Sequence, residues 1–458
     1  MRKLLIPIFE GINYQLLQEW MNAGYLPNFK RLSKEGHLDK LQCTRIPYEP
    51  AGLVSAFSGM RDREHGILAY FHVHNEDYMP VVWKSDQIKE HFFWNFNEFK
   101  DYKIGVINVF GTDPVYPING VMVSYAMRKS LHYTYPSNLL YELSRKNALC
   151  VQDTAVIYNP GYTKDSFFHG VEKIEDLRHR TCKEMLKEDL DILIVNYTLI
   201  ERVSHFYFGE IHQDCPLQEK AVFQAYVKCD KILGDLMEKV YTKNVDLMFF
   251  SEVGFDTHKT FVPVNDYLAE CGLFSYNTDS KMPAYARSTA FESVQGSNGV
   301  NINRKSFYQD GTVSDNEYDQ VLKHTIDCLK KMPNPFCDQP MFASVLPGKS
   351  VYEGDQIPDI LLQPYDWQYL FFGDTYWGNY IHRNCQTGWH RDVSAFGMLG
   401  PHVGKLRDGI CSVEDILPTI YSILNIKNDR NFSGQSIIKG APYDDKSANS
   451  SNILSKTI

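Results

Sequence analysis

RIPYEPAGLVSAFSGMRDREHGI, residues 45–67, places an acidic side chain at the entrance of a clearly delimited helix. Pro50 suits the first helical position, because proline has no N–H to leave unpaired there, and Gly59 suits the end. Glu49 therefore stands where a strand-to-loop turn meets a helix N-terminus. The helix dipole alone would favour an acid at this position, so Glu49 by itself decides nothing about function.

On both sides of this stretch, short apolar runs alternate with amphipathic segments of helical period. Such alternation predicts an α/β fold with a doubly wound, mainly parallel sheet flanked by helices. The first run is interpreted as a strand and not as a signal peptide, because Glu10 and Gly11 interrupt it and no small-residue cleavage site follows. The runs are KLLIPIF (3–9), KIGVINVF (103–110), DILIVNY (191–197), DLMFFS (246–251) and VSAFGMLG (393–400).

The composition changes within the second half of the chain. Residues 273–355 are rich in Ser, Asn, Gly and Pro around one helical run, and they are interpreted as an inserted cap lobe. The core is then expected to comprise 1–272 and 356–440. Residues 441–458 form a polar tail that is expected to be poorly ordered.

Net charge, cysteine pattern and the length of apolar runs indicate which kinds of partner and location to expect. The 458 residues carry a net charge of -9, so the chain lacks the basic character of a protein that binds duplex nucleic acid. Ten cysteines lie scattered without a C-x-x-C pair, which favours reduced thiols and a cytoplasmic location. No run approaches the roughly 18 apolar residues of a membrane span. We therefore expect a small-molecule substrate and no membrane, and the oligomeric state stays open.

Carboxylates and imidazoles follow the predicted strands. Functional groups of open α/β sheets collect at the carboxyl ends of the strands, so these side chains are expected to converge. Each alone has a simpler interpretation, as a solvated loop acid or a core histidine, but together they predict a metal site. Two of them are four residues apart and would share one face of a helix. The set is Glu10, Glu49, Glu201, His205, Glu252 and His390.

Seven motifs in order resemble those of the type I phosphodiesterase/nucleotide pyrophosphatase family of the alkaline phosphatase superfamily. The resemblance covers about residues 1–440 and implies that superfamily's fold, with the cap lining the pocket and aromatic residues such as Phe291 and Tyr308 available there. The motifs are FEGI (9–12), LPNFKRLSKEG (26–36), SAFSGMRDREHGI (55–67), ERVSH (201–205), FFSEVGF (249–255), GWHRD (388–392) and DILPTIYSILNI (415–426).

The resemblance also implies two metal ions, usually zinc, held by three Asp and three His, and a Thr or Ser that attacks phosphorus. Here the three Asp positions hold Glu, namely Glu10, Glu201 and Glu252, and Glu49 occupies the nucleophile position. Two of the three His positions are kept, as His205 and His390, whereas the third holds Val253. His258 is a candidate replacement imidazole, and Arg391 a candidate contact for an anionic group.

Three functions remain open after these departures. The first is a dinuclear metal-dependent hydrolase that uses metal-bound water, with Glu49 as ligand or base. The second is a di-iron or dimanganese enzyme that activates oxygen, because four Glu and two His are the ligands of such centres on helical bundles. The third is a metal-binding scaffold without activity. Zinc, iron and manganese all remain candidates, although carboxylate-rich sites lean toward manganese or iron. Four carboxylates around two divalent ions leave a net charge of about zero, which weakens the first hypothesis.

Overall fold

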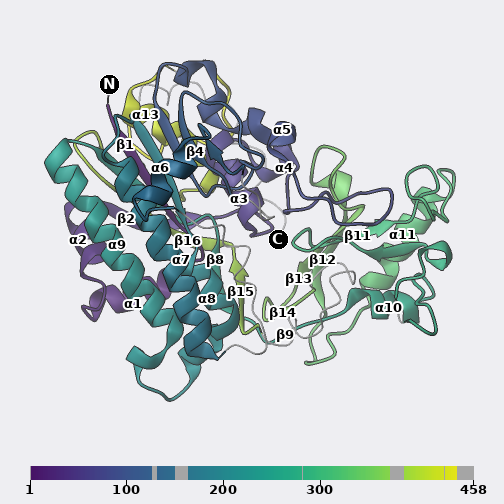
Figure 1. Ribbon diagram of the computed structural model, residues 1–458. Coiled ribbons are helices and arrows are strands. Elements are labelled where there is room, and N and C mark those ends of the chain that lie inside the picture. Colours follow the sequence, from purple (N-terminus) through teal and green to yellow (C-terminus); the bar gives the residue numbers. More distant parts are fainter. Residues whose placement is uncertain are drawn as a thin grey trace.

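The computed structural model describes residues 2–125, 132–149, 163–280, 282–371, 386–427 and 429–440, so the predicted tail 441–458 lies outside the described residues. The main lobe is built on an eight-stranded sheet with the order β2-β16-β7-β1-β6-β3-β4-β5 (Figure 1). Its strands are β1 (Leu4–Phe9), β2 (His37–Gln42), β3 (Ile104–Ile107), β4 (Gly120–Val123), β5 (Thr134–Tyr135), β6 (Ile192–Tyr197), β7 (Asp246–Phe250) and β16 (Val393–Leu399).

Each of the five predicted apolar runs contains one of these strands. The inner strands β7, β1, β6, β3 and β4 are parallel to one another, which confirms the mainly parallel sheet. The run at 393–400 departs from the expectation, because β16 is antiparallel to both β7 and β2. A strand that is buried on both faces reads as a continuous apolar run in either direction, so its sequence carries no signal of orientation.

Helices cover both faces of this sheet. Successive side chains of β1 point to opposite faces, so Leu5 and Phe9 join one apolar core while Ile6 and Ile8 join the other. The first core packs against α1, α2, α7, α8 and α9, and the second against α3 and α13. No helix among the described residues is long and apolar enough to cross a membrane. The helices of this lobe are α1 (Tyr14–Asn22), α2 (Pro27–Glu35), α3 (Glu49–Ser58), α4 (Asp62–His65), α5 (Ser85–Ile88), α6 (Leu139–Arg145), α7 (Lys164–Met185), α8 (Leu199–Tyr207), α9 (Ala221–Lys243) and α13 (Ile416–Leu424).

A second lobe lies beside the first and has its own sheet, with the order β10-β11-β13-β12 (Figure 1). Its apolar core extends from Val262 to Phe371, so it draws in residues on both sides of the predicted insertion 273–355. Two short sheets, β14–β9 and β15–β8, lie outside the two main sheets. The remaining described α-helices and strands are α10 (Val264–Glu270), α11 (Tyr318–Leu329), β8 (Gly254–Thr257), β9 (Thr260–Phe261), β10 (Ala290–Glu292), β11 (Gly299–Ile302), β12 (Phe342–Pro347), β13 (Ile360–Pro364), β14 (Tyr369–Leu370) and β15 (Gly388–Arg391).

Helix α3 forms where the sequence predicts it. It begins at Glu49 with Pro50 in the first turn, and Gly59 ends it in the left-handed conformation with φ of 69°. Its residues are all buried, so the helix is enclosed by the second core and the strand ends. Glu49 is thus held at the N-terminus of a buried helix.

Candidate metal centre

The six predicted ligands lie on separate elements around one edge of the main sheet. Glu10 directly follows β1, Glu252 lies two residues after β7, and Glu49 opens α3. Glu201 and His205 lie on α8, which starts two residues after β6, and His390 lies on β15. All six side chains are buried, with His205 the most exposed at 9%. The carboxyl ends of the strands therefore place charged groups in the interior.

Four of the six meet closely. Glu49, Glu201, His205 and His390 each offer one ligand atom, and these atoms all lie within 4.8 Å of one another. His205 Nε2 lies 2.5 Å from Glu201 Oε1, and His390 Nε2 lies 3.3 Å from Glu49 Oε1 and 3.5 Å from Glu201 Oε1. Two imidazoles and two carboxylates at this spacing are a suitable donor set for a divalent ion.

Glu10 and Glu252 lie outside this group of four. Glu10 Oε1 accepts a hydrogen bond from Asn196 Nδ2 at 2.5 Å, and its other oxygen has no hydrogen-bond partner among the described residues. Neither carboxylate oxygen of Glu252 has such a partner in the described parts of the chain. Buried carboxylates are usually paired or bound to metal, so these oxygens fit a cation.

The carboxylates perturb one another. Burial, and after it the charge of Glu201, raises the pKa of Glu10 well above its usual range. Burial and then the charge of Glu10 raise the pKa of Glu252 in the same direction. Burial would also raise the pKa of Glu201, but Arg202 and His205 outweigh it and hold that pKa well below its usual range.

At His390, on β15, the charges of neighbouring carboxylates outweigh the effect of burial on the pKa. Burial opposes a charged imidazole at His390, yet Glu49 and Glu201 outweigh burial and raise its pKa to about 9. A metal ligand must be a neutral imidazole, so metal binding here competes with a proton.

Arg202 is a charged neighbour that the sequence analysis did not single out. Its Nη1 donates to the Glu201 carboxylate, and its Nη2 donates to the hydroxyl of Tyr125 at 2.7 Å. That hydroxyl lies 3.5 Å from the hydroxyl of Tyr70. In the sequence, Arg202 is marked only by its position inside the motif ERVSH, between the two predicted ligands of α8.

A buried ion pair on α7 fixes the start of α8. Glu175 and Arg178 are fully buried and pair with each other. Glu175 Oε1 accepts the backbone N–H of Leu199 at 2.9 Å, and Arg178 Nη1 donates to the hydroxyl of Thr198 at 3.1 Å. These bonds satisfy groups at the N-terminus of the helix that carries Glu201.

Two glycines allow the close approach of the site elements. A Cβ on Gly11, whose φ is 83°, would lie 2.9 Å from the Glu201 Cα. A Cβ on Gly52, in the first turns of α3, would lie 2.8 Å from both the Cβ and the carbonyl oxygen of Glu252. Side chains at these positions would push the ligands apart.

The two further candidates occupy neighbouring positions with other contacts. The buried ring of His258 packs 4.1 Å from that of Phe261, and His258 is not among the four clustered residues. Burial, followed by the charges of Arg391 and His205, lowers the pKa of His258 to about 3. Arg391 Nη1 donates to the His390 carbonyl at 2.8 Å and Nη2 to the Thr257 carbonyl at 2.5 Å, so its guanidinium ties β15 to β8.

The second lobe, which contains the predicted cap, approaches the candidate centre through its backbone near Gly296. A Cβ at Gly296 would lie 2.1 Å from the Tyr48 ring, and that ring lies 5.4 Å from the His390 ring. The cap aromatics Phe291 and Tyr308 pack against each other in the apolar core of the second lobe. They also line a small cavity of about 20 Å³.

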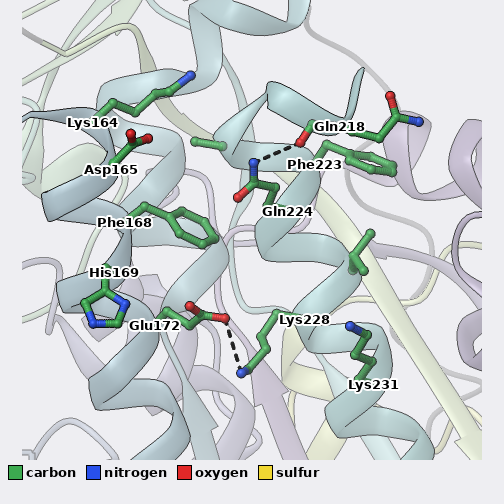
Figure 2. Close-up of a pocket in the computed structure, with 12 residues that line it drawn as sticks. Lys164, Asp165, Phe168, His169, Glu172, Gln218, Phe223, Gln224, Lys228 and Lys231 are labelled. Atoms are coloured by element: carbon green, nitrogen blue, oxygen red, sulfur yellow. Dashed lines mark hydrogen bonds and ion pairs between the residues drawn. The ribbon is translucent and has the colours of Figure 1, made fainter. Parts of the chain in front are cut away.

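A groove on another part of the surface has different chemistry. It lies between α7 and α9, has a volume of about 400 Å³ and is lined by none of the six predicted ligands (Figure 2). The carboxylate of Glu172 lies 3.3 Å from the Lys228 ammonium, as the dashed line in Figure 2 shows. Its charged groups are therefore at least partly paired, unlike the oxygens of Glu252.

Comparison with known proteins identifies the fold. The chain matches human ectonucleotide pyrophosphatase/phosphodiesterase 5 with 14% identity over 95% of this chain and 97% of that one, with a TM-score of 0.56. It matches phosphonoacetate hydrolase from Sinorhizobium meliloti 1021, solved with phosphonoacetate, with 11% identity, coverage of 93% and 95%, and a TM-score of 0.57. The alkaline phosphatase PafA matches with 14% identity, coverage of 95% and 98%, and a TM-score of 0.59.

These likenesses establish the alkaline-phosphatase-like fold. No curated protein matches the chain in sequence. The family model described as type I phosphodiesterase/nucleotide pyrophosphatase matches residues 4–391, which is most of the chain. The chain therefore belongs to the type I phosphodiesterase/nucleotide pyrophosphatase family.

Proposed function

We propose that this protein is a metal-dependent phosphoester hydrolase in which water, and no protein hydroxyl, attacks phosphorus. The observation that carries the proposal is the buried group of Glu49, Glu201, His205 and His390 in a member of a phosphodiesterase family. The donor set fits divalent ions, since two imidazoles and two carboxylates cluster there, and several carboxylate oxygens of the predicted ligands have no hydrogen-bond partner among the described residues. Bound divalent ions would supply Lewis acidity and an acidified water as nucleophile.

Glu49 excludes the usual covalent route. A carboxylate cannot replace a hydroxyl in attack on phosphorus unless a carboxyl-phosphate anhydride forms. The nearby hydroxyls are committed to local contacts: Thr44 Oγ1 donates to the Ile46 carbonyl at 2.7 Å, and Ser55 Oγ lies 3.0 Å from His65 Nε2. Ser58 Oγ accepts the Met60 N–H at 3.1 Å. Glu49 is left with the roles of metal ligand or base toward water.

Arg202 removes the charge objection to an anionic substrate. Four carboxylates and two divalent ions sum to about zero, and the guanidinium beside Glu201 adds one positive charge. The centre then carries about the same charge as three carboxylates with two ions. Such a charge favours a phosphodiester or a phosphonate ester over a neutral ester.

Activity assays on reconstituted protein test the proposal. Metal-replete protein should hydrolyse aryl phosphodiesters or aryl phosphonates, lose activity with a chelator and regain it with divalent metal. Glu201→Gln should abolish hydrolysis, whereas Glu188→Gln, at an exposed position, should leave it unchanged. Metal-replete protein that hydrolyses no phosphoester would overturn the proposal. An iron-dependent absorption band that responds to oxygen would then favour the redox enzyme, and metal binding without either activity would favour the scaffold.

A further inference from the structure

The two halves of the candidate centre differ in their donor atoms. One half contains Glu201, His205 and His390, whose ligand atoms lie close together. The other contains Glu10 and Glu252, which offer only carboxylate oxygens. Glu49 belongs with the first half by distance, since its Oε1 lies 3.3 Å from His390 Nε2, and its Oε2 has no hydrogen-bond partner among the described residues. It also opens α3, whose Gly52 lies against Glu252 in the other half.

The carboxylate half has no imidazole among the described residues near it. Val253, which is fully buried, directly follows Glu252 and offers no ligand atom. The ring of His258 packs against Phe261 and lies 6.4 Å from the Trp389 ring, on the side of His205 and Arg391, whose charges act on it. Among the described residues, the two imidazoles that cluster with carboxylates therefore both belong to the first half.

Glu252 gives independent support for a ligand in the carboxylate half. Its side chain is 0% exposed, and neither oxygen has a hydrogen-bond partner in the described parts of the chain. A buried carboxylate that stays charged is usually paired or bound to a metal ion, so these two oxygens fit a cation. Glu10, whose charge acts on Glu252, likewise has one oxygen without a hydrogen-bond partner among the described residues.

We infer that the centre is heterodinuclear, with a zinc-like ion in the histidine half and a hard ion, Mn²⁺ or Mg²⁺, in the carboxylate half. Imidazole suits zinc and iron, whereas carboxylate oxygen suits magnesium and manganese. Zinc outcompetes manganese at most sites, so the difference is one of relative preference between the halves. The inference rests on the metal centre of the proposed function, but it concerns which ion each half selects.

Manganese titration followed by electron paramagnetic resonance tests the inference. Metal-free protein is given one equivalent of zinc and then titrated with Mn²⁺, and the signal of free Mn²⁺ reports binding. We expect one Mn²⁺ to bind per chain while the zinc stays bound, and crystals of this form should show zinc beside His205 and His390 and manganese beside Glu252 by anomalous scattering. Zinc divided between both halves, or no manganese binding, would overturn the inference.

Variants assign the two ions. Glu252→Gln should weaken Mn²⁺ binding about tenfold or more and leave zinc binding unchanged, and His205→Gln should do the reverse. Val253→His restores the missing imidazole and should let the second half take zinc in preference to Mn²⁺. If that variant does not fold, the wild-type titration and Glu252→Gln still decide. Equal loss of both metals in both single variants would contradict the assignment.

The outcome separates the inference from the proposed function. If zinc occupies one half and manganese the other but the protein hydrolyses no phosphoester, the inference holds and the proposed function is wrong. Hydrolysis by a protein with two equivalent zinc ions would do the opposite. If the protein binds no metal, both the inference and the proposed function are wrong.

Discussion

Arg202 is a partly buried cation next to the candidate metal centre, and the proposed function gives its charge a role in attracting an anionic substrate. It lies next to Glu201 in sequence, donates to that carboxylate, and is held by the Tyr125 hydroxyl. Its side chain is only 20% exposed, so its charge is less screened by water than that of a surface arginine. A guanidinium here compensates for the carboxylate that Glu49 adds.

Replacement of Arg202 measures this compensation. Arg202→Met should lower kcat/KM for an anionic aryl phosphodiester by about tenfold or more, because a hydrogen-bonded charge beside the centre is lost. Arg202→Lys keeps the charge and should retain more activity. A neutral phosphotriester is the control substrate, and Arg202→Met should lower kcat/KM for it less than for the anionic diester. Equal losses for the charged and the neutral substrate would show that Arg202 has only a structural role.

Residues at the ends of strands could be located from the sequence, whereas residues whose side chains depend on distant contacts could not. Glu10, Glu201 and Glu252 could be predicted to lie near one edge of the sheet, because parallel strands end there, whereas their role as metal ligands stays a prediction. Arg202 could not be predicted, since the direction of its side chain depends on Tyr125, 77 residues away in the chain. The division between a histidine half and a carboxylate half likewise depends on where His258 points, which no spacing reveals.

At the scale of elements, the contact between α3 and the segment after β7 sets the site. Gly52 brings the two within reach, and a methyl group there would meet the Glu252 backbone and side chain at 2.8 Å. Glycine inside a helix normally weakens it by roughly 0.5–1 kcal/mol relative to alanine. The contact with Glu252 therefore outweighs helix propensity at this position.

Two glycine substitutions separate these effects. Gly52→Ala should destabilise the protein and lower activity, because Glu252 must move. Gly170→Ala, in helix α7 with no described atom within 4 Å of the added Cβ, should stabilise it by roughly 0.5–1 kcal/mol. Chemical denaturation and phosphodiester hydrolysis measure both. A Gly52→Ala protein with higher stability and full activity would refute the proposed packing.

The ion pair between Glu175 and Arg178 links α7 to α8. Glu175→Gln leaves a buried guanidinium without its carboxylate and should cost about 3–5 kcal/mol in the free energy of unfolding. The double variant Glu175→Gln/Arg178→Met should lose less, because the buried charge is removed as well. The partly exposed pair of Lys146 and Glu184, 3.3 Å apart, is the control, and Lys146→Met should change stability little. Equal losses in the single and double variants would contradict this account.

The sequence predicts where strands and helices occur better than it predicts the direction in which a strand runs. All five apolar runs contain strands, and α3 has the predicted boundaries, because periodicity and the Pro and Gly signals are local. The antiparallel direction of β16 depends on its pairing with β2 and β7, which no local signal records. The extent of the second lobe depends in the same way on β13 joining its sheet from beyond residue 355.

At the scale of the whole molecule, buried histidine makes stability depend on pH. His65 Nδ1 accepts the N–H of Ile67 at 3.0 Å, so its Nε2 carries the proton and faces Ser55. Burial, and then the charge of His91, lowers the pKa of His65 from 6.5 to about 3. The unfolded chain therefore binds a proton more readily than the folded one, and acid favours unfolding.

The resulting pH dependence is measurable. As pH falls from about 6.5 toward 3, His65 should reduce the free energy of unfolding by at most about 1.4 kcal/mol per pH unit. His65→Gln removes this titration, so the difference between wild type and variant should shrink steadily below pH 6.5. Denaturation of metal-free protein across that range measures it without interference from metal binding. A constant difference would contradict a neutral, buried His65.

The central claim is that water attacks phosphorus directly because Glu49 stands in place of a hydroxyl nucleophile. A single in-line attack inverts the configuration at phosphorus, whereas a covalent route through the enzyme involves two attacks and retains it. The most direct measurement is the stereochemical course of hydrolysis of a chiral phosphorothioate diester in isotopically labelled water. We predict inversion, and retention would show that a residue of the protein serves as the nucleophile after all.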